Sequence, residues 1–364
     1  MNTEMQSVRA FAPGRIEILG NHTDYNEGYV LSMAIDLGIT ASLTPRADRN
    51  LLLRSEQSDD AVMAPLDGEI ATTKTWADYA LGVVQQLISR GVKIGGCDIL
   101  YSSNLPQGAG LSSSAALEVS TAVGLSALFG GNFKSLELAK LCRAAENDFV
   151  GVGCGLLDQV SSLFGEESHA ISLDCRSETV ETIPMPENYR WLVISSAVKH
   201  ALTGGEYNER RKQCHEAARI LKIPALRDAN LVMLGEPGLS DVVRRRAMHV
   251  VGENQRVLEG IDFLRSGSMQ EFGSLMYSSH ESSRTNFENS TPELDQLVEI
   301  ARKTAGVLGA RLTGGGFGGA ILCLVKADQA ESIGMAIAEQ YKEQSGHATE
   351  PIICKSSAGA RVLR

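Results

Sequence analysis

The hydrophobic pattern of the first half of the chain predicts a mixture of strands and helices. Apolar runs rich in β-branched residues predict strands at residues 16–19, 29–35, 39–43, 97–101, 170–173 and 191–195. Apolar positions at helical spacing predict helices at residues 76–89, 115–129, 136–149 and 156–164. Ser135 is the expected N-cap of the third helix. Because strands and helices do not alternate strictly, we expect an α+β fold and not a doubly wound sheet.

The second half changes character after about residue 206. Longer and more highly charged helical patterns cover residues 206–221, 242–265, 293–307 and 329–344. An apolar run at 320–325 predicts a buried strand, and 352–354 predicts a short terminal one. This change predicts two domains, residues 1–195 and residues 196–364.

Composition narrows the class of protein. The chain has 364 residues, of which 43% are hydrophobic and 21% charged, and its net charge of −10 argues against a nucleic-acid or anionic-membrane surface. Seven cysteines are scattered without any C-x-x-C pair, which favours reduced thiols over disulfides or zinc. The start of the sequence lacks the pattern of a signal peptide, and no apolar run approaches membrane-spanning length. We therefore expect a cytoplasmic protein.

A glycine-rich turn before the helix at 115–129 is a candidate phosphate site. Gly108 and Gly110 precede three serines, Ser112 to Ser114, at the start of the helix. Free backbone N–H groups at the positive end of a helix dipole favour anions. The segment lacks the Gly-Lys-Ser/Thr of a Walker loop. An ordinary capped connection explains the same residues, and both interpretations stay open at this point.

Two acidic residues follow this turn. Glu146 continues the apolar helix line of Leu138 and Cys142, and Asp158 follows a second glycine-rich segment. A buried carboxylate needs a partner, so a cap or an ion pair is the simplest explanation. One Glu and one Ser also suffice to hold Mg²⁺, which keeps further ligands from phosphates and water.

Asp158 and Arg15 form a second candidate pair. A carboxylate can take the proton of an attacking hydroxyl, while a guanidinium stabilises charge on a transferred phosphoryl group. An adjacent guanidinium also favours the ionised carboxylate, which makes it a weaker base. Whether Asp158 abstracts the proton or orients the hydroxyl stays open.

Residues 21–25 place five hydrogen-bonding side chains on one loop, from Asn21 to Tyr25. A ligand rich in hydroxyl groups, such as a sugar, needs this density of donors and acceptors. A solvated, self-capping turn is the alternative. We do not expect His22 to bind metal, because no other His or Cys lies nearby at useful spacing.

Three segments resemble the sequence motifs of the GHMP small-molecule kinases, and within them those of the galactokinases. These are residues 13–26, beginning Pro-Gly-Arg, the turn and helix start at 105–118, and Thr-Gly-Gly-Gly-Phe-Gly-Gly at 313–319. Shorter segments between them, at 155–159, 205–211, 279–280 and 292–295, are also similar. The resemblance therefore extends over almost the whole chain.

The resemblance implies ATP-dependent phosphorylation of the anomeric hydroxyl of a hexose, D-galactose to galactose 1-phosphate. It implies an N-terminal domain of the ribosomal-S5-like type, a C-terminal α/β domain and an active site in the cleft between them. By resemblance Asp158 is the catalytic carboxylate and Arg15 its electrostatic partner, while Ser114 and Glu146 hold Mg²⁺. The sugar contacts would be Asn21, His22, Asp24, Gly155 and Tyr207. The ATP contacts would be Gly108, Ala109, Gly110, Leu111, Ser112, Ser113, Ser114 and, near the nucleotide, Trp76.

Some positions depart from the family. Asn21 stands where galactokinases usually have Glu, and Glu17 and Ser32 stand where Asn and Pro are common. Losing a negative charge at position 21 predicts tolerance of a C6 carboxylate, so galacturonate is an alternative substrate, as is N-acetylgalactosamine. A silent sugar and ATP sensor is a further alternative. The expected partners are ATP and a small sugar, with a monomer or weak homo-oligomer.

Overall fold

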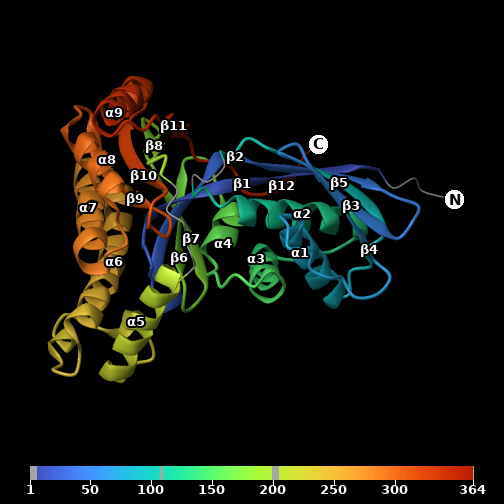
Figure 1. Ribbon diagram of the computed structural model, residues 1–364, viewed down its shortest axis with the longest axis horizontal. Coiled ribbons are helices and arrows are strands. Elements are labelled where there is room, and N and C mark those ends of the chain that lie inside the picture. The colour runs from blue at the N-terminus through green and yellow to red at the C-terminus, as the bar shows by residue number, and fades with distance from the viewer. Residues whose placement is uncertain (1–5, 107–109, 199–204, 364) are drawn as a thin grey trace.

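The computed structural model describes residues 6–106, 110–198 and 205–363 and contains two β-sheets (Figure 1). The larger sheet has the strand order β12-β1-β2-β5-β3-β4, and β6 and β7 extend it from β2. All its neighbouring strands are antiparallel except β3 and β5. Its strands are β1 (Val8–Leu19), β2 (Tyr29–Pro45), β3 (Asn50–Ser55), β4 (Ser58–Pro65), β5 (Cys97–Ser103), β6 (His169–Asp174), β7 (Thr179–Pro184) and β12 (Arg361–Leu363).

Strand β2 is continuous where the sequence predicts two strands. Its middle stays extended because Gly38 pairs with Pro13 of β1. A side chain at Gly38 would begin only 2.3 Å from the carbonyl oxygen of Ala12. The β1–β2 register shifts between Pro13 and Arg15 and again between Glu17 and Leu19. Such irregularities re-aim side chains, and here they flank Arg15 and Glu17.

Four helices lie on one side of this sheet (Figure 1). They are α1 (Ala77–Ser89), α2 (Ser113–Phe129), α3 (Ser135–Ala144) and α4 (Leu157–Phe164). Of these, α2 and α4 are in contact with β1 and β2, and the other two pack against these helices. The helix predicted at 136–149 differs: α3 ends at Ala144 and continues as a π-helical turn, Ala145–Val150. Ser135 is not its N-cap, since Lys134 holds that position and the Glu137 carboxylate accepts from the Lys134 backbone N–H at 2.9 Å. π-turns are common at functional sites, and this one carries Glu146.

The smaller sheet is antiparallel, with the order β11-β8-β10-β9. Its strands are β8 (Tyr189–Ser195), β9 (Val307–Thr313), β10 (Ala320–Lys326) and β11 (Ile352–Cys354), and its core is shared with α8 (Pro292–Lys303) and α9 (Ala330–Ser345). The helix predicted at 293–307 ends at Lys303, which leaves Val307 to begin β9. The chain crosses between the sheets more than once, because β8 joins the smaller sheet and β12 returns to the larger. The domain division at residue 195 stays a prediction.

A group of long helices completes the fold beside the smaller sheet (Figure 1). It consists of α5 (Gly205–Leu221), α6 (Asp241–Ser266) and α7 (Met269–Ser282), the last of which the sequence pattern did not predict. The short helical turns are Asp24–Asn26, Leu226–Asp228, Met233–Gly235, Ser283–Phe287 and Ala327–Gln329.

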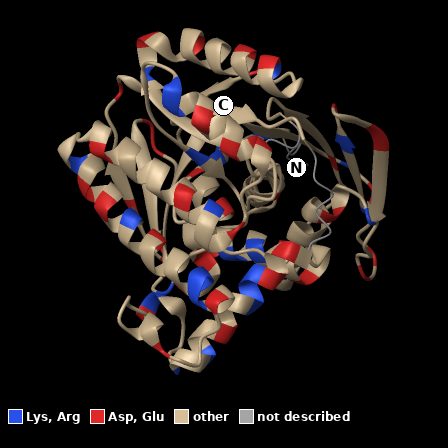
Figure 2. Ribbon diagram, turned by 60° about the vertical axis from the view of Figure 1, so that its left-hand side comes forward, with Lys and Arg blue, Asp and Glu red and all other residues tan. Residues whose placement is uncertain are grey.

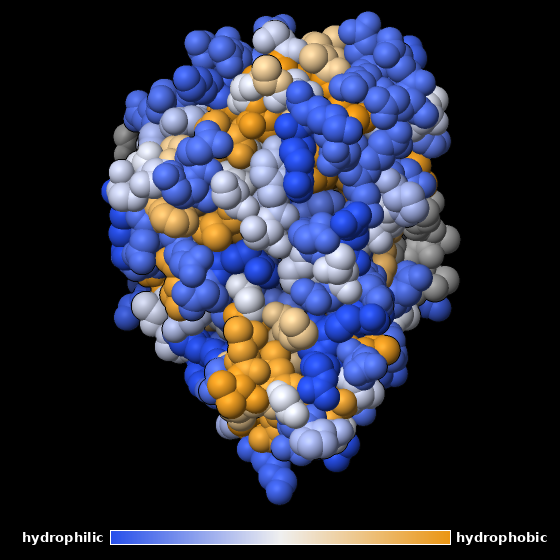
Figure 3. Space-filling model, turned by 90° about the vertical axis from the view of Figure 1, so that its left-hand side faces the viewer, coloured by the Kyte–Doolittle hydropathy of each residue, from blue (hydrophilic) through white to orange (hydrophobic). Residues whose placement is uncertain are grey.

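Acidic and basic residues are interspersed along the long helices (Figure 2), and the face that these helices present is largely hydrophilic with small apolar areas (Figure 3). None of the helices in the described ranges has the length and apolar character needed to cross a membrane.

A buried carboxylate on α6 ties the loop after β1 to these helices. Glu253 is fully buried and accepts hydrogen bonds from the backbone N–H groups of Gly20 and Asn21, at 3.0 and 3.4 Å. It also accepts from Ser279 at 2.8 Å and from Arg256 at 2.7 Å. Burial alone would raise the pKa of Glu253, but Arg256 and Arg311 outweigh it and hold the pKa below its usual value. The ionised carboxylate therefore stabilises the folded state.

We expect Glu253→Ala to lower the free energy of unfolding by about 3–5 kcal/mol, because it leaves Arg256 and two buried N–H groups without their acceptor. Since the folded pKa of Glu253 is depressed, its stabilisation is present above the unfolded pKa and is lost as the pH falls towards the folded pKa. Denaturant unfolding at pH 7 measures the first effect, and a series from pH 5 to pH 3 follows the loss as the pH falls below the unfolded pKa of about 4.5. Asp262→Ala, an exposed acid on the same helix, is the control and should stay within about 0.5 kcal/mol. Equal losses in the two variants would contradict this role for Glu253.

Candidate active site

A cavity of about 500 Å³ lies between β1, the loop after it, α4, α5 and the loop before β10. It gathers both predicted catalytic residues and all five predicted sugar contacts. The lining residues include Arg15, Glu17, Asn21, His22, Asp24, Gly155, Asp158, Tyr207, Gly314 and Gly315. Segments separated by almost three hundred residues in the chain thus share one wall.

Asp158 and Arg15 form an ion pair at this cavity. Arg15 Nε donates to Asp158 Oδ1 at 2.8 Å, and Arg15 Nη1 donates to the carbonyl of Gly110 at 2.7 Å. Ser112 Oγ donates to Asp158 Oδ2 at 2.6 Å. Asp158 lies in the first turn of α4, so helix, strand and glycine-rich turn meet at one carboxylate. The predicted pairing of Arg15 with Asp158 is therefore present in the structure.

The glycine-rich turn approaches β1 very closely. Arg15 N–H donates to the carbonyl of Leu111 at 3.1 Å, and a side chain at Gly14 would begin 2.6 Å from that same oxygen. Only glycine at position 14 allows this contact. The Pro-Gly-Arg segment therefore holds the turn as well as supplying Arg15.

The turn leads directly into the N-terminus of α2. Gly110 and Ser112 both have positive φ, and α2 begins at Ser113 with Ser114 next to it. No side-chain hydrogen bond caps this helix at its start. Its first N–H groups are thus available to an anion, as expected for a phosphate site. Gly108 and Ala109, two of the predicted ATP contacts, lie outside the described residues.

His22 lines the cavity in a left-handed backbone conformation, with φ of 61°. Its Nε2 donates to the carbonyl of Gly315 at 2.9 Å, because a carbonyl can only accept. Its Nδ1 therefore accepts from the Tyr25 hydroxyl at 2.8 Å. Burial lowers the pKa of His22 to about 3, so the ring is neutral. With both nitrogens bonded, His22 fixes the loop against the segment at 313–319.

The side-chain nitrogen and oxygen of Asn21 both form hydrogen bonds to other protein atoms. Its amide donates to Glu17 Oε1 at 2.9 Å and to the Gly314 carbonyl at 2.6 Å, and its oxygen accepts from Asn289 at 2.9 Å. The carboxylate missing at position 21 is thus replaced by that of its bonded neighbour, Glu17. The structure therefore removes the premise that Asn21 makes the cavity less negative.

Asp24, Gly155 and Tyr207 form another part of the wall. A side chain at Gly155 would begin 2.1 Å from Asp24 Oδ2, so glycine is required there. Burial raises the pKa of Asp24 from 3.8 to about 6, and the charges of Glu17 and Asp158 add to this shift. Tyr207 lies against His22, with ring centroids 5.0 Å apart.

Glu146 and Glu118 form a buried pair of carboxylates. Gln159 Nε2 donates to one oxygen of each, at 2.9 Å and 3.0 Å, and Cys154 Sγ donates to Glu146 at 3.2 Å. Burial raises the pKa of both acids. The second oxygen of Glu118 is buried without a hydrogen-bond partner. Two carboxylates with a free buried oxygen suit a hard divalent cation, and Ser114 offers a further oxygen.

Within the described ranges there is no group of three or more His, Cys, Asp or Glu able to hold a metal ion. His22, with both nitrogens engaged, is not a ligand. The roles of Ser114 and Glu146 stay predictions.

Trp76 lies apart from this cavity, at the start of α1. Its ring meets Tyr101 of β5 edge-on, with centroids 5.7 Å apart, and its indole N–H is buried without a partner. Its predicted contact with the nucleotide stays a prediction.

Sequence reasoning did not assign roles to Glu17, Glu118, Gln159 or Arg311. Glu118 carried a usable signal, because an acid stands among Ala and Leu on a helix that is apolar on all sides. Glu17 was noted as a departure from the family but not linked to Asn21. The spacing of four residues along an irregular strand did not reveal that their side chains meet.

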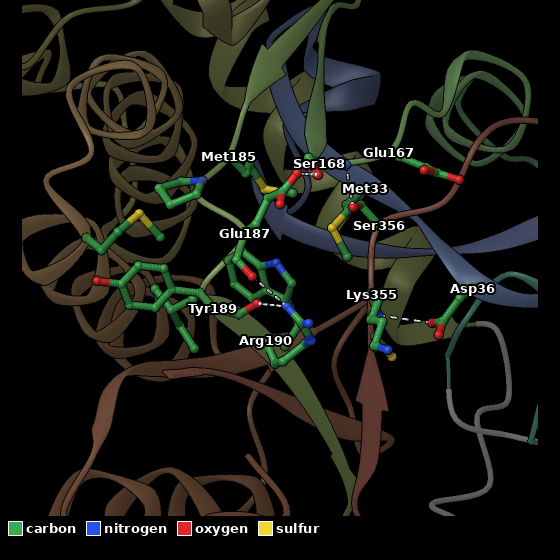
Figure 4. Close-up of a pocket in the computed structure, with 15 residues that line it drawn as sticks. Met33, Asp36, Glu167, Ser168, Met185, Glu187, Tyr189, Arg190, Lys355 and Ser356 are labelled. Atoms are coloured by element: carbon green, nitrogen blue, oxygen red, sulfur yellow. Dashed lines mark hydrogen bonds between the residues drawn. The ribbon is translucent and has the colours of Figure 1, made fainter. Parts of the chain in front are cut away.

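A second cavity of about 390 Å³ lies between the two sheets, away from Asp158 (Figure 4). Arg190 and Lys355 lie on one side, with Asp36, Glu167 and Glu187 around them. Arg190 donates to the backbone carbonyls of Glu187 and Tyr189, and Lys355 is exposed. None of the predicted site residues is among those that line this second cavity.

Comparison with known proteins defines the class. Residues 2–45 match the galactokinase galactose-binding signature, residues 78–166 the GHMP kinases N terminal domain and residues 261–343 the GHMP kinases C terminal domain. The fold resembles the crystal structure of mevalonate kinase from Methanococcus jannaschii, with 19% identity, coverage of 98% of this chain and 100% of that one, and a TM-score of 0.70. It also resembles homoserine kinase from Cytophaga hutchinsonii, with 16% identity, coverage of 100% of this chain and 99% of that one, and a TM-score of 0.67. Fold and site together define a GHMP-type small-molecule kinase.

A nearer likeness fixes the family. The crystal structure of Lactococcus lactis galactokinase complexed with galactose is 34% identical, covers 99% of this chain and 96% of its own, and has a TM-score of 0.94. The chain belongs to the galactokinase family of GHMP kinases. It is an ATP-dependent phosphotransferase that acts on a sugar hydroxyl. The predicted α+β fold and the predicted family are thus confirmed.

The raised pKa of Asp24 gives a prediction for stability. The folded protein keeps a proton on Asp24 up to about pH 6, whereas the unfolded chain loses it near 3.8, so the ionised group destabilises the fold fully above pH 6 and not below pH 4. We expect Asp24→Asn to raise the free energy of unfolding by about 1–3 kcal/mol at pH 7.5, and so to unfold at a higher temperature than the wild type. At pH 4 the two proteins should be equally stable. Thermal unfolding at the two pH values measures this, with the exposed Asp59→Asn as control. A variant less stable than the wild type at pH 7.5 would refute the assignment.

Proposed function

We propose that this enzyme phosphorylates the anomeric hydroxyl of D-galactose to give galactose 1-phosphate. The observation that carries the proposal is the meeting of Asp158, Arg15 and Ser112 beside an uncapped helix N-terminus, on the wall of a polar cavity. The reacting hydroxyl would lie beside Asp158 on one side of this cluster. The phosphates would lie at the start of α2, on the other side. The galactose bound to the L. lactis relative and the galactose-binding signature at residues 2–45 support the choice of sugar.

In this proposal Asp158 accepts a hydrogen bond from the sugar hydroxyl and orients it towards the phosphoryl group. Phosphoryl transfer needs positioning and charge stabilisation more than a strong base. Arg15 holds Asp158 by its Nε and reaches the turn by its Nη1, so it links the carboxylate to the phosphate side. The backbone N–H groups at 110–114 and the start of α2 accommodate the triphosphate of ATP.

We propose that Glu146 and Ser114 hold Mg²⁺ here, with Glu118 and Gln159 fixing Glu146. When bound, the cation would offset the negative charge of the phosphates and of the two buried glutamates. Gln159 donates to both glutamates and so keeps Glu146 in one orientation.

The charges of the cavity favour a neutral sugar over a uronic acid. Its lining contains three carboxylates, on Glu17, Asp24 and Asp158, and one guanidinium, on Arg15, which is paired with Asp158. The buried Arg311 pairs with Glu17 behind this lining, so no free cation faces a ligand among the lining residues. A C6 carboxylate would add like charge at close range. We therefore rank galactose above galacturonate, and the intact ion pair favours a kinase over a silent sensor.

We further propose a cytoplasmic enzyme that acts as a monomer or weak homo-oligomer. The seven cysteines are all unpaired, and five of them are buried, which suits a reducing compartment.

Asp158→Ala should lower kcat for galactose by at least about a thousandfold, since it removes the group that orients the hydroxyl and leaves Arg15 unpaired. ADP release in a coupled assay measures turnover, and circular dichroism with thermal unfolding checks that the fold is retained. A matched control is Asp98→Ala on β5. It removes one of the two carboxylates that pair with Arg46 and does not alter the cavity lining. Near-normal turnover in Asp158→Ala would exclude the proposed role.

The charge argument predicts substrate preference. We expect kcat/KM for galactose to exceed that for galacturonate by at least about a hundredfold, which corresponds to roughly 2.7 kcal/mol. N-acetylgalactosamine in the same assay tests tolerance at C2. A preference for the uronate would overturn the ranking and, with it, the choice of galactose.

A further inference from the structure

We infer that Glu17 is a sugar-binding residue, whose free carboxylate oxygen accepts a hydrogen bond from one non-reacting hydroxyl of the substrate. The inference rests on the proposed function, because it concerns the same cavity. Strand β1 would then contribute two residues to the site, Arg15 and Glu17, and Glu17 would select a substrate with a hydroxyl donor at that position.

The two oxygens of Glu17 have different surroundings. Oε1 accepts from Asn21 Nδ2 at 2.9 Å and lies 3.4 and 3.5 Å from Arg311 Nη2 and Nη1. Oε2 has no hydrogen bond within the described residues, and it is not among the buried polar atoms without a partner. Glu17 lines the cavity and is only 6% exposed. A ligand in the cavity therefore lies beside a carboxylate with one oxygen unused by the protein.

The side chain is held rigidly behind that oxygen. Arg311 is fully buried and also donates to the backbone carbonyls of Glu17 and Ile18, at 3.2 and 3.1 Å. Thr313 Oγ1 donates to the Glu17 carbonyl at 3.1 Å. A fixed carboxylate loses little entropy when a ligand binds, which is the condition for a selective contact.

Asn21 cannot make this contact in the present arrangement. Its two N–H groups already donate to Glu17 and Gly314, and its oxygen accepts from Asn289. Glu17 thus has a free acceptor beside a saturated amide. An acceptor that has no protein donor is open to a ligand, and a sugar hydroxyl would supply the hydrogen bond.

The substitution Glu17→Gln tests this with little change of shape. Asn21 and Arg311 both donate to the Oε1 position, so the new amide must place its oxygen there and its NH₂ group towards the cavity. The acceptor offered to the sugar thereby becomes a donor, and its charge is lost. We expect kcat/KM for galactose to fall about 10- to 100-fold, as for loss of a charge-assisted hydrogen bond.

The decisive measurement compares wild type and Glu17→Gln on galactose and its 2-, 3-, 4- and 6-deoxy forms. If Glu17 accepts from one hydroxyl, the variant loses less than about threefold on the deoxy sugar that lacks it and keeps the full loss on the others. Asp174→Asn, which breaks a comparable Asp–Arg pair with Arg227 outside the cavity, should show the same kcat/KM pattern as the wild type. An equal loss on all five sugars would reduce Glu17 to a structural partner of Arg311 and overturn the inference.

A carboxylate exchange provides a second test. Asn21→Glu alone places two carboxylates within hydrogen-bonding distance, and we expect a loss of more than about a hundredfold in kcat/KM. Combining it with Glu17→Asn restores one carboxylate and one amide, and should recover activity to within about tenfold of the wild type. A double variant no better than the worse single one would count against Glu17. Absence of both turnover and binding of galactose by the wild type would instead contradict the proposed function, and this role with it.

Discussion

The loop after β1, at residues 20–25, depends on a buried carboxylate that lies more than two hundred residues further along the chain. Glu253 accepts the backbone N–H groups of Gly20 and Asn21, and His249 on the same helix donates to the carbonyl of Asn21 at 3.0 Å. His22 in this loop has a positive φ, which is unfavourable for a residue with a side chain, whereas Gly20 adopts its positive φ without that penalty. The hydrogen bonds from α6 hold the backbone on both sides of this conformation.

The two parts of the cavity wall have different origins. The cluster of Arg15, Asp158, Ser112 and Gly110 belongs entirely to the larger sheet and its helices. The wall around Asn21 and His22 also needs Asn289 and the loop between β9 and β10, because Gly314, Gly315 and Asn289 hold these two side chains in place.

Local patterns were enough to predict the elements around Asp158, but not the contacts that distant segments make around Asn21. The helix carrying Asp158 and the turn before α2 follow from apolar spacing and glycines within a few residues. The two strands predicted within β2 merge because Gly38 packs on Ala12, a contact that only the β1–β2 pairing creates. The π-turn that carries Glu146 has no periodicity of its own to detect. Arg311 reads as an ordinary strand residue until its burial against Glu17 is seen.

Position 21 shows why a single substitution is a weak guide to specificity. Considered alone, Asn in place of Glu removes a negative charge and opens the cavity to a uronic acid. In the structure Asn21 donates to Glu17, so the pair still has one carboxylate and one amide, and only their order along the chain has changed. Two carboxylates at that distance would repel strongly, and two amides would leave Arg311 without its counter-ion. The constraint therefore acts on the pair, and it is the free oxygen of that pair, on whichever residue it stands, that the sugar meets.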